Sequence, residues 1–332
     1  MPRIAEASDR TAAIEVGSRA VRVLVADVQG GILSEVWASS APFRFPAGTP
    51  GQLSEAARTL ASIVERFEDA AASHGARVIF TFGTAALRKA MATNDVEAIL
   101  RHTVRVLSPE EEAGFSALAA ASAVPEGCGR KVMLTIDQGA QSLELASSSL
   151  PVELSQLRCQ TLPLGTEELL AHLMANGRSV AELLREVSAD FSAAHPTPLE
   201  PFATVLQGSV PTKLAWLTKG EKGKYRPARV HGQKLDVRLL RRMLASFASA
   251  SPQAWEEARQ RFGGDGQDKL EVERVLAGAV QLSVILQSYR VEQFYVSSRG
   301  TRHGALLWRS GRNSPVEQRD LAAVGLSSPR PT

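Results

Sequence analysis

The chain contains little of several residue types that mark special classes of protein. Of its 332 residues only Cys128 and Cys159 are cysteines, so neither a disulfide framework nor a cysteine-rich zinc site is expected. No apolar run approaches the ~20 residues that a membrane helix needs. The N-terminal MPRIAEASDR also lacks the apolar core of a signal peptide. These absences predict a cytoplasmic protein with no membrane partner.

A strong charge of one sign is also absent. The formal net charge is +3, with lysine and arginine scattered along the chain, so we expect no specific nucleic-acid partner. One basic stretch, TKGEKGKYRPARVHGQK at 218–234, is the exception. Two interpretations of it stay open: a solvated loop, or a surface that lines the path of an anionic ligand.

The residues that are present are typical of a globular α/β protein. Hydrophobic residues make up 44% of the chain and charged residues 22%, and a chain of this length is expected to form two domains. Strand-like and helix-like segments alternate from residue 77 onward, which favours helices layered on sheets. A helix is predicted from residue 53, with Ser54 as a candidate N-cap and Gly75 as a stop signal.

A first β-hairpin is predicted near the N-terminus. The apolar segments 12–16 and 21–28 flank Gly17 and Ser18. Glu15 stands at the end of the first segment, and Arg19 stands in the turn. Backbone N–H groups in such a turn point towards anions, so the pattern predicts a phosphate-binding turn.

The same layout occurs in MLTIDQGAQSLEL at 133–145. An apolar run ends at Asp137, a turn containing Gly139 follows, and Ser142 and Glu144 begin the returning strand. A carboxylate at a strand end beside a tight turn can hold a metal ion together with the phosphate bound to it. Two such hairpins predict a duplicated fold with a cleft between its halves.

These patterns divide the chain into three parts. We expect an N-terminal domain over 1–125, a second domain over 126–310, and a polar tail without fixed structure over 311–332. The apolar helix predicted at 271–289 fits either the core or a homodimer interface.

Seven short stretches, in order, resemble the exopolyphosphatase / guanosine-pentaphosphate phosphohydrolase (Ppx/GppA) family. The resemblance covers residues 12–308 and matches the short members, which carry no appended helical domain. The stretches are AAIEVGSRAVRVLVADV, GTAALRKA, VLSPEEEAGFSALAA, IDQGAQSLEL, TLPLGTEEL, LQGSVPTKLA and the closing helix and turn, AGAVQLSVIL with VSSRGTRHGAL.

The resemblance implies an α/β fold of two actin-like (ribonuclease H-like) domains with a phosphate-binding cleft between them. It implies hydrolysis of a phosphoanhydride bond in inorganic polyphosphate or a guanosine polyphosphate such as guanosine pentaphosphate, with Mg²⁺ as the cofactor. Phosphoryl transfer to water needs positive charge and N–H donors on the phosphates, and a carboxylate that activates the water.

The family's functional positions fall on identifiable residues of this chain. Glu112 would be the general base and Glu144 a second catalytic carboxylate, while Asp137 and Glu15 would hold the metal ion. The expected phosphate-binding residues are Gly17, Ser18, Arg19, Arg88, Gly139, Ser142 and Gly208. Simpler interpretations are a helix N-terminus that favours acidic residues for Glu112 and a solvated helical arginine for Arg88.

Several positions depart from the family pattern. Glu15 and Arg19 replace an aspartate and an asparagine in the first turn, and Ala140 and Gln141 replace glycines in the second. Glycine there lets the backbone approach a phosphate, and Gln141 should obstruct that approach unless its side chain turns away. Two hypotheses follow: a hydrolase with altered phosphate loops, or a weakly active or inactive homologue that binds polyphosphate or a nucleotide as a regulator.

Overall fold

The computed structural model describes residues 9–46, 49–91, 94–100, 103–125, 131–175, 180–194, 201–219, 225–248, 253 and 270–311. The chain forms two compact units, of which unit 2 comprises residues 119–300 and unit 1 comprises the residues on either side of it. This division differs from the predicted one, because the chain returns to unit 1 at Thr301 instead of remaining in the second domain to residue 310. The tail prediction for 312–332 lies outside the described residues. No helix in the described part of the chain is long and apolar enough to cross a membrane.

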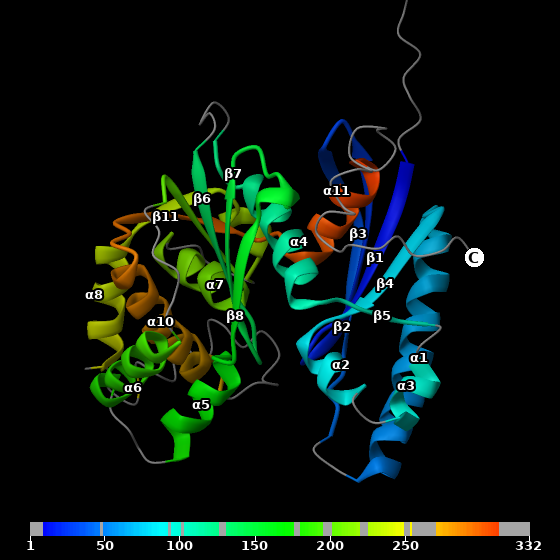
Figure 1. Cartoon of the computed structure of the whole chain (residues 1–332), viewed down its shortest axis with the longest axis horizontal. Helices are drawn as coiled ribbons and strands as arrows, with labels where there is room; N and C mark the ends of the chain where they lie inside the picture. Colours follow the sequence, from blue (N-terminus) through cyan, green and yellow to red (C-terminus); the bar gives the residue numbers. More distant parts are fainter. Residues whose placement is uncertain are drawn as a thin grey trace, which may run out of the picture. The chain divides into compact units, whose positions relative to one another are not determined.

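Unit 1 contains a mixed sheet with helices on both faces (Figure 1). Its strand order among the described residues is β3-β2-β1-β4-β5. Strands β1, β2 and β3 are antiparallel, and β4 and β5 run parallel to β1. The elements are β1 (Asp9–Val16), β2 (Ala20–Gln29), β3 (Ile32–Pro42), α1 (Pro50–Ser73), β4 (Val78–Gly83), α2 (Ala85–Ala90), α3 (Asn94–Leu100), β5 (Arg105–Val106), α4 (Pro109–Ala121) and α11 (Thr301–Gly311).

Helix α1 covers one face of this sheet. Its buried residues Ala57, Leu60 and Val64 pack on Ile14 and Val23 of the hairpin, as the spacing of apolar residues predicts. The helix begins at Pro50, before the predicted N-cap Ser54. Thr49 precedes it, and the Thr49 backbone N–H donates to Gln52 Oε1 at 2.8 Å. Proline is favoured in the first helical turn because its missing N–H is not needed there.

The opposite face of the sheet is covered by α11 and α4. Trp308 of α11 packs on Phe115 of α4 with ring centroids 5.0 Å apart, and Phe80 of β4 lies 6.5 Å from Trp308. A Cβ atom at Gly304 would overlap the Phe115 carbonyl oxygen, so the two helices meet through this glycine. The last described helix of the chain therefore completes the core of the first unit.

Unit 2 repeats the plan with one additional strand. The strand order among its described residues is β10-β11-β9-β6-β7-β8. Strands β6, β7 and β8 are antiparallel, β9 and β11 run parallel to β6, and β10 is antiparallel to β11. The elements are β6 (Val132–Gln138), β7 (Leu143–Ser149), η1 (Leu154–Gln156), β8 (Arg158–Leu162), α5 (Thr166–Ala175), α6 (Val180–Ala193), β9 (Ala203–Gln207), α7 (Ser209–Thr218), η2 (Pro227–Val230), β10 (Gln233–Asp236), α8 (Val237–Ala248), α10 (Glu271–Ser288) and β11 (Gln293–Ser297).

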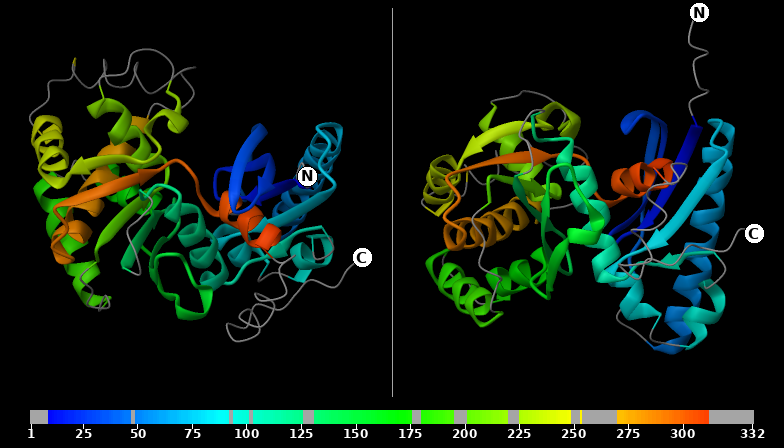
Figure 2. Two further views of the ribbon diagram at one scale, coloured as in Figure 1. Left: turned by 90° about the horizontal axis from the view of Figure 1, so that it is seen from above. Right: turned by 45° about the horizontal axis from the view of Figure 1, so that its top comes forward.

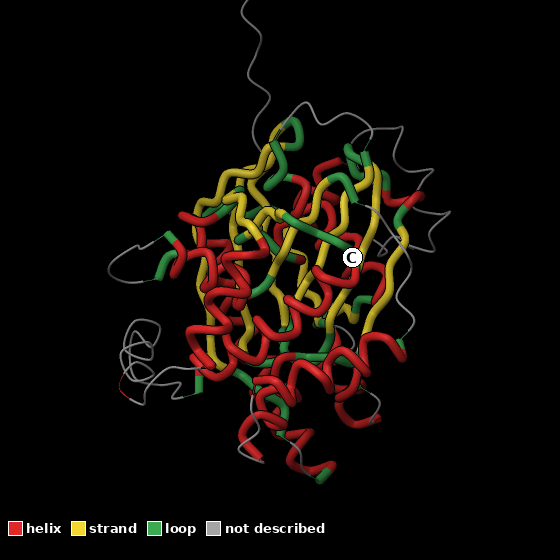
Figure 3. The backbone as a smooth tube through the Cα atoms, turned by 90° about the vertical axis from the view of Figure 1, so that its left-hand side faces the viewer, coloured by secondary structure: helices red, strands yellow, loops and turns green. Residues whose placement is uncertain are grey.

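Helix α10 forms the centre of the unit 2 core. Residues 271–286 are all buried, and the helix contacts α5, α6, α7 and α8 (Figure 2). This burial within one chain decides between the two interpretations of the apolar stretch, because the helix belongs to the core. The described residues contain both strands and helices (Figure 3), and from β4 onward strands and helices largely alternate, apart from the run β6, β7 and β8.

Candidate active site

The first predicted phosphate turn lies where β1 passes into β2. Gly17 N–H donates to the Ala20 carbonyl at 3.1 Å, which closes a narrow turn over Ser18 and Arg19. A Cβ atom at Gly17 would lie 3.2 Å from Arg22 Nη1 and 3.3 Å from the Ala20 oxygen. Glycine therefore lets the turn lie directly against the Arg22 guanidinium.

Glu15 lies between two arginines at the base of this turn. It is paired in register with Arg22 of β2, and Arg22 Nη1 lies 3.9 Å from Glu15 Oε1. From the other side, Arg302 Nε of α11 lies 3.4 Å from Glu15 Oε2. Burial lowers the pKa of the Arg302 guanidinium, and the Glu15 carboxylate acts in the opposite direction. Two guanidinium groups thus stand at the first turn.

Sequence reasoning did not assign a role to Arg22. The signal was present, because a hairpin turn after Val16 fixes the register and sets residue 22 opposite residue 15. The contact of Arg302 with Glu15 has no such local signal, since the two residues are far apart in the sequence.

Helix α4 begins at the carboxyl edge of the same sheet. Val16, Gly83 and Val106 are neighbours in register at the ends of β1, β4 and β5. The loop after β5 leads to Ser108, which caps α4. Ser108 Oγ accepts from Glu111 N–H at 3.2 Å, and Ser108 N–H donates to Glu111 Oε2 at 2.9 Å. This reciprocal capping box gives Glu111 a structural role, as do its contacts with Arg105.

Glu112 is buried beside this cap and is held by Arg88. Arg88 Nη1 donates to Glu112 Oε2 at 2.9 Å and to the Leu107 carbonyl at 2.7 Å. Glu112 is only 8% exposed. The structure therefore couples two predicted site residues, a carboxylate at a helix N-terminus and the arginine that orients it. The prediction that Arg88 binds phosphate stays untested.

In unit 2 the second hairpin brings two carboxylates together. Asp137 of β6 and Glu144 of β7 are paired in register, so their side chains lie on the same face of the hairpin. Glu144 is 4% exposed, and its carboxylate accepts a hydrogen bond from the Ser142 hydroxyl. Three of the predicted residues are thus adjacent.

The tip of the second hairpin packs on the start of α5. Gly139 N–H donates to the Ser142 carbonyl at 3.0 Å, and the Gly139 and Ala140 carbonyls accept from Thr166 and Glu167 N–H at 3.1 and 3.0 Å. A Cβ atom at Gly165 would overlap the Ala140 carbonyl oxygen. Gly165 lies within the stretch TLPLGTEEL, but the sequence pattern alone assigns it no role.

The two substitutions in this turn are accommodated without backbone strain. Arg290 is the only non-glycine residue with positive φ in the described part of the chain, so Ala140 and Gln141 do not occupy a glycine conformation. Gln141 is exposed. The turn therefore needs no positive φ at these two positions, and the prediction that Gln141 obstructs a phosphate stays untested.

Gly208 joins β9 to the N-terminus of α7. Its φ of +110° is unfavourable for residues with a side chain, and a Cβ atom would lie 2.5 Å from the Gln138 carbonyl oxygen. The Gly208 carbonyl accepts from Thr212 Oγ1 at 2.9 Å. Asp137 and Gln207 are neighbours in register. Gly208 therefore places the first turn of α7 beside the second hairpin; in that turn Ser209 and Val210 carry backbone N–H groups and Pro211 carries none.

The carboxylates of the two units differ in how well they suit a divalent cation. Glu15 already faces two arginine cations, which disfavours binding of a metal cation there. Asp137 and Glu144 form a paired carboxylate set with a hydroxyl nearby, and Mg²⁺ commonly binds one or two carboxylates and completes its shell with water and phosphate. Among the described residues there is no group of three or more His, Cys, Asp or Glu residues that could hold a metal ion.

Comparison with known proteins agrees with this arrangement. The family model described as the Ppx/GppA phosphatase family matches residues 24–311. The chain belongs to the Ppx/GppA family. Exopolyphosphatase 1 of Mycobacterium leprae is 26% identical over 313 residues, which cover 90% of this chain and 88% of that protein. Exopolyphosphatase 1 of Mycobacterium tuberculosis H37Rv is also 26% identical and is covered over 87% of its length.

Solved structures show that the fold is shared with other Ppx/GppA members. The Aquifex aeolicus family member has a TM-score of 0.73 at 20% identity, with coverage of 92% of this chain and 98% of that chain. An exopolyphosphatase from Cytophaga hutchinsonii has a TM-score of 0.67 at 14% identity, with coverage of 92% and 99%. The predicted α/β class with two actin-like domains is confirmed.

Proposed function

We propose that this Ppx/GppA protein hydrolyses the phosphoanhydride bonds of inorganic polyphosphate or guanosine pentaphosphate and releases orthophosphate. The observation that carries the proposal is Glu112. It is a buried carboxylate that the α4 capping box does not use, and Arg88 holds it. The names of the mycobacterial relatives support polyphosphate as the substrate.

The proposed reaction transfers a phosphoryl group to water. The Glu112 carboxylate accepts a proton from the attacking water, the water oxygen bonds to the terminal phosphorus, and the bond from that phosphorus to the bridging oxygen breaks. Orthophosphate leaves, and the shortened chain keeps the bridging oxygen. Arg88 would keep the carboxylate in one orientation.

The remaining site residues would bind the phosphates. Other backbone N–H groups of the turns at Gly17, Gly139 and Gly208 would bind phosphate oxygens, since the Gly17 and Gly139 N–H groups themselves close their turns. Arg22 and Arg302 would add positive charge, with Glu15 fixing both guanidinium groups. Asp137 and Glu144 would hold Mg²⁺, which would neutralise charge on the phosphates.

The test is phosphate release by a Glu112→Gln variant. Glutamine keeps the size and one oxygen for Arg88 but cannot accept the proton, and loss of a general base lowers the rate by about 10²–10⁴-fold. Phosphate release from polyphosphate and from guanosine pentaphosphate is measured with Mg²⁺ present. The matched control is Glu110→Gln, an exposed neighbour in the same helical turn, which should keep wild-type activity.

The alternative is a binding protein on the same scaffold. A wild-type chain that binds polyphosphate but releases no phosphate would support the alternative. Equal release by wild type and Glu112→Gln would remove Glu112 from the mechanism.

A further inference from the structure

A strip of cationic side chains follows one edge of unit 2. The sequence from Tyr225 to Ser246 contains six lysines and arginines and a single carboxylate, Asp236, whereas the whole chain has a net charge of only +3. All six cationic residues are exposed. We name as the basic strip Arg226, Arg229, Lys234, Arg238, Arg241 and Arg242.

Helix α8 carries half of the basic strip on one face. Arg238, Arg241 and Arg242 have i, i+3 and i+4 spacing, which aligns side chains along a helix. The opposite face of α8 is anchored in the core through Leu240 and Leu244. This anchoring keeps the three guanidinium groups at the surface and orients them together.

The carboxylates beside the strip leave its charge positive. Asp236 pairs with Arg238, with 2.8 Å between Asp236 Oδ2 and Arg238 Nη2, and this contact lowers the pKa of Asp236 to about 2. The Glu292 carboxylate also attracts the Arg238 guanidinium electrostatically and contributes to raising the pKa of Arg238. The Arg238 side chain is nevertheless 81% exposed, so it still reaches solvent.

The strip begins at the strand ends that carry the phosphate turn of unit 2. Ser297 of β11 is in register with Gln207, the residue before Gly208. Just beyond β11, Ser298 N–H donates to His231 Nδ1 at 3.3 Å, and Gly232 N–H donates to the Val296 carbonyl at 2.8 Å. Since β10 runs antiparallel to β11, the strip leads from this end of the sheet to the opposite end.

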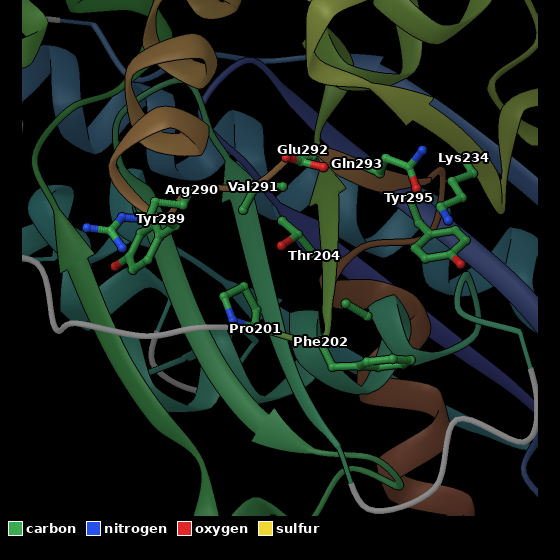
Figure 4. Close-up of a pocket in the computed structure, with 11 residues that line it drawn as sticks. Pro201, Phe202, Thr204, Lys234, Tyr289, Arg290, Val291, Glu292, Gln293 and Tyr295 are labelled. Carbon is green, nitrogen blue, oxygen red and sulfur yellow. The ribbon is translucent and has the colours of Figure 1, made fainter.

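Midway along the strip, Lys234 borders a pocket of about 420 Å³ (Figure 4). Its Nζ lies 5.8 Å from the centroid of the Tyr295 ring. Arg290 and Glu292 also line the pocket, at the amino ends of β9 and β11. The cationic path is therefore continuous with a recess in the surface.

The layout selects an extended anion as the ligand. Exposed single cations bind one phosphate weakly, because solvent screens them, whereas a row of them binds a polyanion through many contacts and displaced counterions. Nucleic-acid surfaces add aromatic side chains for base stacking. Residues 226–242 contain no Phe, Tyr or Trp, so the strip itself carries no base-stacking side chain; the aromatic residues nearby, Phe202, Tyr289 and Tyr295, line the pocket beside Lys234.

We propose that the basic strip binds long-chain inorganic polyphosphate and retains the chain while its end is hydrolysed. The proposal rests on the proposed function for its choice of polyanion. It extends that function by assigning substrate-length preference to η2, β10 and α8.

The test measures binding of end-labelled long-chain polyphosphate by fluorescence anisotropy in the Glu112→Gln background, where the probe stays intact. Arg238→Gln, Arg241→Gln and Arg242→Gln are combined in one variant. Loss of three phosphate contacts should weaken binding by at least about tenfold at moderate salt and flatten the salt dependence. Unlabelled tripolyphosphate should compete equally poorly in both proteins.

Two further variants separate charge from folding. The triple arginine-to-lysine variant at the same positions should bind like the parent, because the charges remain. A triple variant of Arg58→Gln, Arg66→Gln and Arg77→Gln, three exposed arginines of unit 1, should also bind like the parent. Unchanged affinity in the α8 glutamine variant would overturn the proposal, as would single-stranded RNA that displaces polyphosphate at equal phosphate concentration.

Hydrolysis assays distinguish this proposal from the proposed function. With an active Glu112, the α8 glutamine variant should hydrolyse tripolyphosphate normally and show a raised KM for long chains. If the wild type binds long chains through the basic strip but releases no phosphate, the proposed hydrolase function is wrong and the proposed binding role of the strip is supported. If wild type and the α8 glutamine variant release phosphate from long chains with the same KM, the proposed binding role of the strip is wrong and the hydrolase function is supported.

Discussion

Gly208 shows how a single residue fixes the geometry of the unit 2 site. Replacement by alanine places a Cβ atom 2.5 Å from the Gln138 carbonyl oxygen at a φ of +110°. We expect Gly208→Ala to lower the free energy of unfolding by about 1–3 kcal/mol, from backbone strain of this kind. Urea denaturation measures the change.

Gly51 provides the matched control for this substitution. It lies in α1, and a Cβ atom there meets nothing within 4 Å. Gly51→Ala should leave the protein unchanged or stabilise it by up to about 1 kcal/mol, since alanine favours helix. Equal midpoints for the two variants would contradict the role given to Gly208.

Asp137 and Glu144 lead to a prediction about metal removal. Chelation of divalent cations should abolish phosphate release, and added Mg²⁺ should restore it. Asp137→Asn should require more Mg²⁺ for half-maximal activity, because an amide oxygen carries no charge. Glu15→Gln should leave the Mg²⁺ requirement unchanged if Glu15 only holds the Arg22 and Arg302 side chains in place. A larger shift with Glu15→Gln than with Asp137→Asn would reverse this assignment.

The sequence predicts which residue types stand at the site better than it predicts what they contact. Glycine and carboxylate after an apolar run identify both turns, because strand ends and turns follow local rules. The second arginine on Glu15 comes from α11, far along the chain. Such a contact depends on tertiary packing, and a local pattern cannot specify it.

At the scale of the element, the α4 cap offers a stability test. Ser108→Ala removes the hydroxyl that accepts from Glu111 N–H, and loss of an N-cap costs about 1 kcal/mol. Ser54→Ala is the comparison, because Ser54 was the predicted cap of α1 but lies inside the helix with its hydroxyl bonded to the Pro50 carbonyl. Thermal unfolding should show a loss for the first variant only. A comparable loss for Ser54→Ala would support the original cap assignment.

The sequence predicts the shortest strands and helices least well. The sequence predicts both hairpins, but it does not predict β10 (Gln233–Asp236) as a strand. Four residues carry too little alternation to reveal a strand. The segment is a strand because it pairs with β11, which is a tertiary contact.

At the scale of the whole molecule, the chain enters unit 1, completes unit 2, and then returns. Residues 119–300 should therefore fold as an isolated fragment, because their sheet and covering helices are internal. Residues 1–118 should lack cooperative unfolding until the α11 segment 301–311 is supplied, since Trp308 and Gly304 complete the packing around Phe115. Circular dichroism during urea titration tests both fragments. Cooperative unfolding of 1–118 at the same midpoint with and without the peptide would refute this dependence.

The late arrival of α11 also has a consequence for synthesis in the cell. The ribosome makes the first 118 residues early, but the helix that covers Phe80 and Phe115 emerges only after all of unit 2. At about 5–20 residues per second this interval is on the order of 10–40 s. During that time only α4 covers part of this face of the nascent first sheet, and the aromatic surface left exposed is a target for chaperones that bind the growing chain.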